Sequence, residues 1–215
     1  MKISLFISIV ILSIFPNYSI NAQSTDFDYG NIERNIYMNK YFGIEMSLPQ
    51  DWIVQSREQI DNIMKTGKNL AAGDDAKMKA IFKASEVNSA NLLAVYKYEI
   101  GSAVDYNPNM AMIAENIKNF PGIKSGKDYL FHARKFMEQS QFKYDSLDSE
   151  FTKENINGIE FYKMNAEINY MKIKIKQVYY STVAQQFCLS FIISYISDEQ
   201  KPELINSLNT LKIRK

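Results

Sequence analysis

The chain has 215 residues, of which 46% are hydrophobic and 23% are charged, and its formal net charge is +1. This balance excludes a disordered tail, a multi-pass membrane protein and a strongly basic nucleic-acid-binding protein. A single His and a single Cys cannot form a His/Cys metal centre or an intrachain disulfide within one chain. We therefore expect no metal site, no cofactor and no nucleic-acid partner.

The first 22 residues have the pattern of a secretory signal peptide. Lys2 precedes an uncharged, mostly apolar run from Ile3 to Phe15, which is shorter than the roughly 20 residues that a transmembrane helix needs. We predict cleavage after Ala22, a secreted or periplasmic location and no integral membrane segment in the mature protein. An uncleaved N-terminal anchor is the alternative. Loss of Lys2 leaves equal numbers of acidic and basic residues.

The segment 23–35 is polar and is predicted to be a flexible leader to a single domain at 36–215. Residues 36–38 and 41–48 are expected to form a hairpin, because alternate residues from Phe42 to Leu48 are apolar. Trp52 follows directly, and core packing beneath the sheet is its favoured role over that of a ligand platform.

Two helices are expected next, and together they make up a helical stretch at 57–90. The first covers 57–68, where Ser56 and Gln59 have the spacing of a capping box. The second begins at Asp74-Asp75 and continues through Phe82. Strands at 91–100 and 110–115 and a long helix at 127–142 follow.

The C-terminal third is predicted to be an antiparallel meander, because its strands are joined by short turns. The last strand has a face of mostly small residues, Cys188, Ser190, Ile192 and Ser194, which indicates a closely packed helix. A final helix begins after Ser197. The predicted strands are 149–153, 158–169, 171–182 and 186–196. The class is α+β, with helices covering a central antiparallel sheet.

Two groups of residues resemble the PsbP-like superfamily, with its Mog/PsbP-type fold, over roughly 37–213. One group comprises 41–44 and the Leu48–Trp52 segment, and the other comprises 177–180, 188–195, Asp198-Glu199 and 208–213. For a bacterial secreted member, the resemblance implies a three-layer α/β/α sandwich and a non-catalytic binding or assembly role. The stretch at 57–90 is longer than in a minimal member and is a candidate lid or contact surface.

The sequence provides no catalytic constellation. A Cys–His dyad would need both Cys188 and His132, and Cys188 lies in an apolar strand where a thiol behaves as a small hydrophobe. The G-x-S-x-G motif is absent, and the segment 122–128 lacks the spacing of a P-loop. The acidic cluster around Asp145, Asp148 and Glu150 is better interpreted as a solvated loop than as a glycosidase pair.

Two surface features are candidate binding sites. Lys172, Lys174 and Lys176, called the lysine stripe below, alternate with apolar residues. The stripe suits an anionic partner such as lipopolysaccharide, an acidic glycan or a membrane surface. A solvated strand face, or an edge protected by lysine, is the favoured alternative. Tyrosines are also candidates to line a pocket, although core or rim packing is favoured; they are Tyr96, Tyr98, Tyr106 and Tyr129.

We therefore expect a secreted or periplasmic, non-enzymatic domain that binds a protein or an envelope component. The alternative is a small-molecule or lipid carrier with a pocket between the sheet and the helices at 57–90. A hydrolase of unrecognised mechanism is the least favoured hypothesis. The partner and the oligomeric state are not specified by these patterns.

Overall fold

The computed structural model describes residues 27–214, and the predicted signal peptide and its cleavage site lie outside this range. Within it, no helix combines the length and the apolar character that crossing a membrane would require. The helices are α1 (Arg57–Ala72), α2 (Ala76–Ser85), α3 (Gly126–Gln139), the short 3₁₀ helix η1 (Asp198–Gln200) and α4 (Lys201–Leu208).

The strands form two antiparallel sheets. An eight-stranded sheet has the order β4-β5-β6-β11-β10-β9-β7, with β8 paired to β9, and a four-stranded sheet has the order β1-β2-β3-β12. The strand bounds are β1 (Asn31–Glu33), β2 (Ile36–Asn39), β3 (Ile44–Ser47), β4 (Ile53–Val54), β5 (Ser89–Tyr96), β6 (Asn109–Asn116), β7 (Tyr144–Leu147), β8 (Thr152–Ile156), β9 (Ile159–Tyr170), β10 (Ile173–Ala184), β11 (Phe187–Tyr195) and β12 (Lys212–Ile213).

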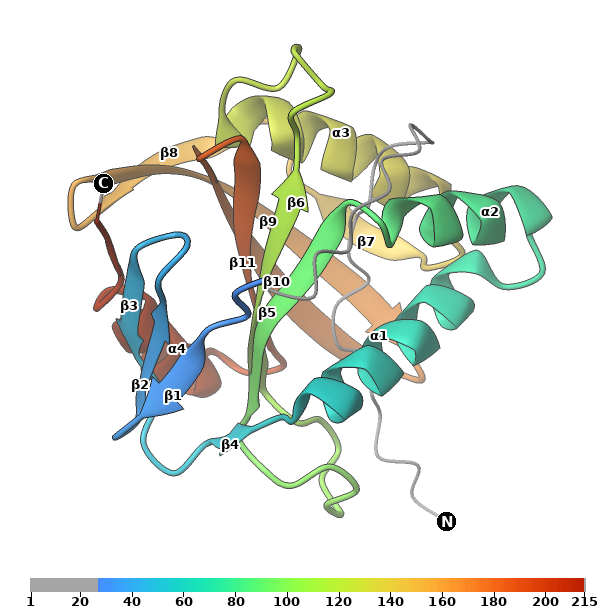
Figure 1. The fold of residues 1–215 in the computed structure, drawn as a ribbon. Coiled ribbons are helices and arrows are strands. Elements are labelled where there is room, and N and C mark those ends of the chain that lie inside the picture. The colour runs from blue at the N-terminus through green and yellow to red at the C-terminus, as the bar shows by residue number, and fades with distance from the viewer. Residues whose placement is uncertain (1–26, 215) are drawn as a thin grey trace.

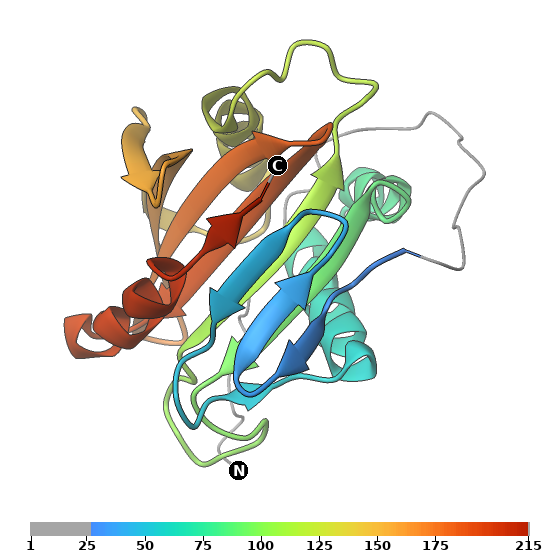
Figure 2. The same ribbon diagram turned by 60° about the vertical axis from the view of Figure 1, so that its left-hand side comes forward.

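The eight-stranded sheet is the middle of three layers. Helices α1, α2 and α3 cover one of its faces, and the four-stranded sheet lies with α4 over the other (Figures 1 and 2). Each face has its own buried apolar core, because side chains alternate along every strand. The predicted α+β class with a central antiparallel sheet is confirmed, and the second outer layer includes a small sheet as well as a helix.

Helix α3 packs unusually closely on the sheet, at the face of small residues predicted for the last strand. A Cβ placed on Gly126 would lie 1.9 Å from the carbonyl oxygen of Ser181 on β10. The buried core between the eight-stranded sheet and helices α1, α2 and α3 is called the helix-side core below. It contains Cys188 and Ile192 of β11 and Leu130 of α3. The predicted close helix contact is therefore confirmed, and only glycine fits at the first position of α3.

Several short strands differ from the prediction, which placed no strand at β1, β4, β7 or β12. Part of the expected leader, Asn31–Glu33, forms β1, which pairs with β2. The carboxylate of Asp28 accepts backbone N–H bonds from Gly30, Lys40 and Tyr41, which hold this segment against the hairpin. Such hydrogen bonds require no hydrophobic pattern in the sequence, and β1 was therefore not predicted.

The region 144–156 also departs from the prediction of one strand at 149–153. It contains β7 and β8, and both pair with β9. Asp145 accepts a hydrogen bond from Asn169, and Asp148 accepts from the backbone and side-chain nitrogens of Asn165. Two residues of the acidic cluster thus anchor an edge strand, which argues for a structural role.

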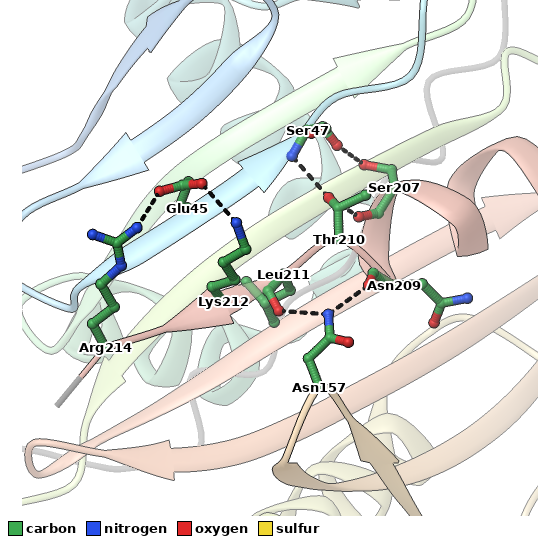
Figure 3. A network of polar contacts seen from close by, with 9 residues as sticks. All are labelled: Glu45, Ser47, Asn157, Ser207, Asn209, Thr210, Leu211, Lys212 and Arg214. Carbon is green, nitrogen blue, oxygen red and sulfur yellow. Dashed lines mark hydrogen bonds and ion pairs between the residues drawn. The ribbon is translucent and has the colours of Figure 1, made fainter.

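The C-terminal segment joins three parts of the fold (Figure 3). β12 pairs with β3, and Glu45 of β3 forms ion pairs with Lys212 at 3.0 Å and Arg214 at 2.9 Å. The Asn157 side chain, in the turn between β8 and β9, donates to the carbonyls of Asn209 at 2.6 Å and Leu211 at 3.0 Å. The last residues described therefore tie the small sheet to the large one.

Candidate functional site

Helix α1 contacts both α2 and β5 (Figure 1). Residues of these three elements line an open cleft of about 560 Å³. We call it the α1–α2 cleft. Its lining residues share a position between the two helices and the adjoining end of β5. They are Tyr29, Arg57, Asp61, Met64, Lys65, Lys68, Asn69, Ala72, Lys79, Phe82, Lys83, Glu86, Ser89 and Asn91.

Local sequence signals fix the two helices that form the cleft. The Ser56–Gln59 capping box satisfies the start of α1, as predicted, and Asp75 accepts from the N–H groups of Lys77 and Met78 at the start of α2. The apolar faces of both helices pack into the helix-side core, where Met64 and Phe82 are buried. The polar faces are left to form the walls of the cleft.

Positive charge dominates the walls of the cleft. Lys65 lies on α1, and Lys79 and Lys83 lie on α2, one helical turn apart. Within residues 27–214, the ammonium groups of these three lysines have neither an ion pair nor a hydrogen bond. By contrast, Lys68 forms an ion pair with Glu86 at 3.1 Å. The cleft therefore has three uncompensated positive charges on two opposing walls.

The single arginine of the cleft is already engaged. The Arg57 guanidinium lies 3.6 Å from the centroid of the Tyr29 ring and 3.6 Å from the carboxylate of Asp61. It also donates to the backbone carbonyl of Asn91 on β5. Arg57 thus closes one end of the cleft, and its planar donor groups serve the fold rather than the open space.

A second open cleft lies beside α3, with the lone imidazole in its wall. We call it the α3 cleft. Its residues come from α3, the turn before that helix and the segment between β7 and β8: Gly122, Lys127, Asp128, Phe131, His132, Ser149, Glu150 and Phe151. Its combination of a histidine, a carboxylate and a serine raises the question of nucleophilic catalysis.

The bonds of Asp128 answer that question in favour of a structural role. Its Oδ2 accepts from the backbone N–H groups of Lys124 and Ser125, each at 3.0 Å, and from the Ser125 hydroxyl at 2.9 Å. Burial raises the pKa of this carboxyl, but the bonds from Lys124 and Ser125 outweigh it and lower the pKa overall. Asp128 is thus the N3 residue of a capping box at the start of α3, where Ser125 is the N-cap.

Cys188 and His132 lie in different environments. The Cys188 side chain is 1% exposed within the helix-side core, and burial raises the pKa of its thiol. His132 lines the α3 cleft at the surface. Among residues 27–214, no group of three or more His, Cys, Asp or Glu side chains has the arrangement of a metal site.

The lysine stripe lies on and before β10. Lys174 forms an ion pair with Glu167 of β9 at 3.1 Å, and Lys176 forms one with Asp198 of η1 at 2.9 Å. The hydrogen bond that Lys176 donates to Asp198 raises the pKa of Lys176. Lys172 lies in the β9–β10 turn with φ of 69°. Two charges of the stripe are therefore compensated by acidic neighbours.

The four candidate tyrosines are not gathered around an open space. Tyr96, Tyr106 and Tyr129 are buried in the helix-side core, whereas Tyr98 is 40% exposed. The Tyr129 hydroxyl donates to the carboxylate of Glu115 at 2.7 Å, and the hydroxyls of Tyr106 and Ser194 are hydrogen-bonded. None of the four lines either of the two clefts described above.

Sequence reasoning marked the stretch at 57–90 as a contact surface but missed its lysines. Lys65 and Lys68 are three residues apart on α1, and Lys79 and Lys83 are four apart on α2. Each spacing places two cations on one side of a helix. That signal was present in the sequence, and only the packing of α1 against α2 turns it into a site.

Comparisons with known proteins give similarity of fold without a family. No family model matches this chain, and no curated protein matches it. A solution structure of cyanobacterial PsbP from Synechocystis has 11% identity and a TM-score of 0.48, covering 90% of this chain and 97% of that one. A crystal structure from Bacteroides thetaiotaomicron has 11% identity and a TM-score of 0.46.

The Bacteroides match covers 80% of this chain and 46% of that chain, so this chain spans about half the length of that protein. A protein of unknown function from Pseudomonas aeruginosa has 12% identity and a TM-score of 0.41, covering 60% of this chain and 83% of that one.

Proposed function

We propose that this chain is a secreted or periplasmic, non-enzymatic binding domain of the PsbP-like type, and that the α1–α2 cleft holds a negatively charged protein or envelope component. The observation that carries the proposal is the set of three unpaired lysines on opposing walls of the cleft. Uncompensated positive charge in a concave site attracts anions more strongly than the same charge on a convex surface.

The packing of the helix side favours surface binding over the carriage of a ligand inside the domain. A carrier needs an enclosed space between the sheet and its covering helices. Here Met64, Phe82 and Phe136 fill that space together with side chains from the strands, and the Phe82 and Phe136 rings meet edge to face at 5.2 Å. The open space lies outside this core, between the polar faces of the helices.

A charge-reversal experiment tests the proposal. The triple variant K65E/K79E/K83E removes the positive charge of the cleft, and K172E/K174E/K176E makes the same change in net charge at the lysine stripe. We expect wild-type protein to be retained on a heparin column and to elute with salt, since the attraction is electrostatic. The cleft variant should pass through the column, and the stripe variant should remain bound.

Circular dichroism of both variants checks that the fold is retained. An equal loss of retention in the two variants would mean that net charge alone governs binding. Elution of the cleft variant at the same salt concentration as the wild-type protein would contradict the proposal directly.

A further inference from the structure

The α1–α2 cleft also indicates the chemistry of its ligand, an inference that rests on the proposed function. We infer that the cleft binds a tetrahedral oxyanion, a phosphate or a sulfate group, in preference to a carboxylate. The arrangement of Lys65, Lys79 and Lys83, together with the engagement of Arg57, leads to this assignment.

The first argument is the direction from which the positive charges approach. Lys65 extends from α1, whereas Lys79 and Lys83 extend from α2 on the other side of the cleft. A phosphate or sulfate group has three free oxygens that diverge in space, so three ammonium groups on two walls can each meet an oxygen of their own. A carboxylate has only two oxygens, which three ammonium groups would have to share.

The second argument is the kind of donor that is free. Arginine binds a carboxylate through two parallel N–H donors, and it binds phosphate in the same way. Arg57 stacks on Tyr29, pairs with Asp61 and donates to Asn91, so its charge and the orientation of its plane are already fixed by the fold. The remaining cations are lysines, which act as point charges with freely rotating donors and bind phosphate in many proteins.

The third argument is the size of the cleft. Its volume of about 560 Å³ is well above what a single inorganic ion occupies. Sites for small organic ligands commonly measure about 300–1,000 Å³. The oxyanion is therefore one group of a larger molecule, whose remainder lies along the cleft towards Ser89 and Asn91.

Isothermal titration calorimetry with three ring compounds tests the inference. Inositol hexakisphosphate, inositol hexasulfate and mellitic acid have the same number of acidic groups on rings of the same size, but the phosphate compound is the most highly charged, because each phosphate group can lose two protons. The hexasulfate and mellitic acid are matched in charge, and we expect the hexasulfate to bind wild-type protein about tenfold more tightly than mellitic acid, a difference within the range of charge-assisted contacts. Titration with the hexakisphosphate then shows whether the cleft also accepts phosphate.

Two double variants locate the binding. K79Q/K83Q removes two charges from the cleft and should weaken the tighter ligand by about tenfold or more. K174Q/K176Q removes two paired charges from the lysine stripe and should leave affinity within about twofold of wild type. Thermal melting of each variant confirms that the comparison is made between folded proteins.

The outcomes separate this inference from the proposed function. Equal or tighter binding of mellitic acid, with all ligands weakened by K79Q/K83Q, would overturn the preference for an oxyanion and leave an anion-binding cleft in place. Binding of all three ligands unchanged by K79Q/K83Q would overturn the site itself, and the proposed function with it.

Discussion

The two faces of the eight-stranded sheet are stabilised in different ways. The face towards the four-stranded sheet is almost wholly apolar, with Phe161, Phe191 and Ile193 fully buried. The face towards α1, α2 and α3 carries a strip of buried polar side chains along three neighbouring strands: Asn109, Glu115, Gln177, Ser181, Ser190 and Ser194. The first face depends almost wholly on apolar burial, whereas the second adds specific hydrogen bonds to an apolar core of its own, and both clefts lie at its outer surface.

The largest difference between the faces should appear on removal of an aromatic side chain. Phe191 is 0% exposed on a central strand, with its ring 5.8 Å from that of Phe161. Phe191→Ala should lower the free energy of unfolding by about 4–5 kcal/mol, because the cavity is closed on all sides. Phe82→Ala removes a ring beside the open α1–α2 cleft and should cost about 3 kcal/mol, since that site can collapse or hydrate. Urea unfolding measures both, and equal losses would contradict the distinction.

A hydrogen-bond deletion tests the polar character of the helix-covered face. Tyr129→Phe removes the donor to Glu115, a carboxylate that is 1% exposed, and should cost about 1–3 kcal/mol of unfolding free energy. Tyr180→Phe makes the same change on the apolar face, where it should cost less than about 0.5 kcal/mol. A loss at Tyr180 as large as that at Tyr129 would show that the faces do not differ in this respect.

Low pH should destabilise the face of the eight-stranded sheet that is covered by the four-stranded sheet, and Glu203 is the group responsible. The Glu203 carboxylate accepts hydrogen bonds from Lys97 and from the indole N–H of Trp52, each at 2.7 Å. These bonds, with that from Lys97 the larger, lower the pKa of Glu203 below its ordinary value. Its contribution to stability is therefore complete above the unfolded-state pKa of about 4.3 and is lost as pH falls through the lower folded-state pKa.

The fluorescence of Trp52, the single tryptophan, reports this titration directly. We expect a change in its emission below about pH 4.3, together with a small fall in unfolding free energy. In Glu203→Gln the emission should not titrate in this range. Persistence of the same acid transition in that variant would assign it to another group.

The smallest predicted effects distinguish paired from unpaired lysines. Lys176→Gln breaks the ion pair with Asp198, which is largely exposed, and should lower the free energy of unfolding by about 0–1 kcal/mol. Lys65→Gln removes no partner and should change it by less than about 0.5 kcal/mol. Thermal unfolding of the two variants is the measurement, and marked destabilisation by Lys65→Gln would reveal a structural role for that lysine.

The sequence predicted the long central strands and the helix starts, because these depend on local patterns. Alternation along β11 placed Phe191 and Cys188 on opposite faces, as the two cores confirm. The capping box at Ser56 was likewise visible. The strands β1 and β7 were missed, because they are fixed by hydrogen bonds that backbone N–H groups of neighbouring segments donate to Asp28 and Asp148.

The candidate site could be predicted only in part, because the sequence shows which residues are charged but not which of them are paired in the fold. The lysine stripe was conspicuous, yet its acidic partners Glu167 and Asp198 come from a neighbouring strand and a later turn. The lysines of the α1–α2 cleft were less conspicuous, and they remain unpaired because no acidic side chain of residues 27–214 lies within ion-pair distance of them. Strand register determines the pairing of the lysine stripe, and the packing of α1 against α2 determines the position of the cleft lysines.

The anchoring of β12 also has a consequence for the order of folding. Lys212 meets its partner Glu45 across 167 residues of sequence, so the four-stranded sheet cannot be completed until β12 has been made. Contacts of such long range are slow to form. During synthesis the β2–β3 hairpin therefore waits for β12, and the four-stranded sheet is completed later than the hairpin itself.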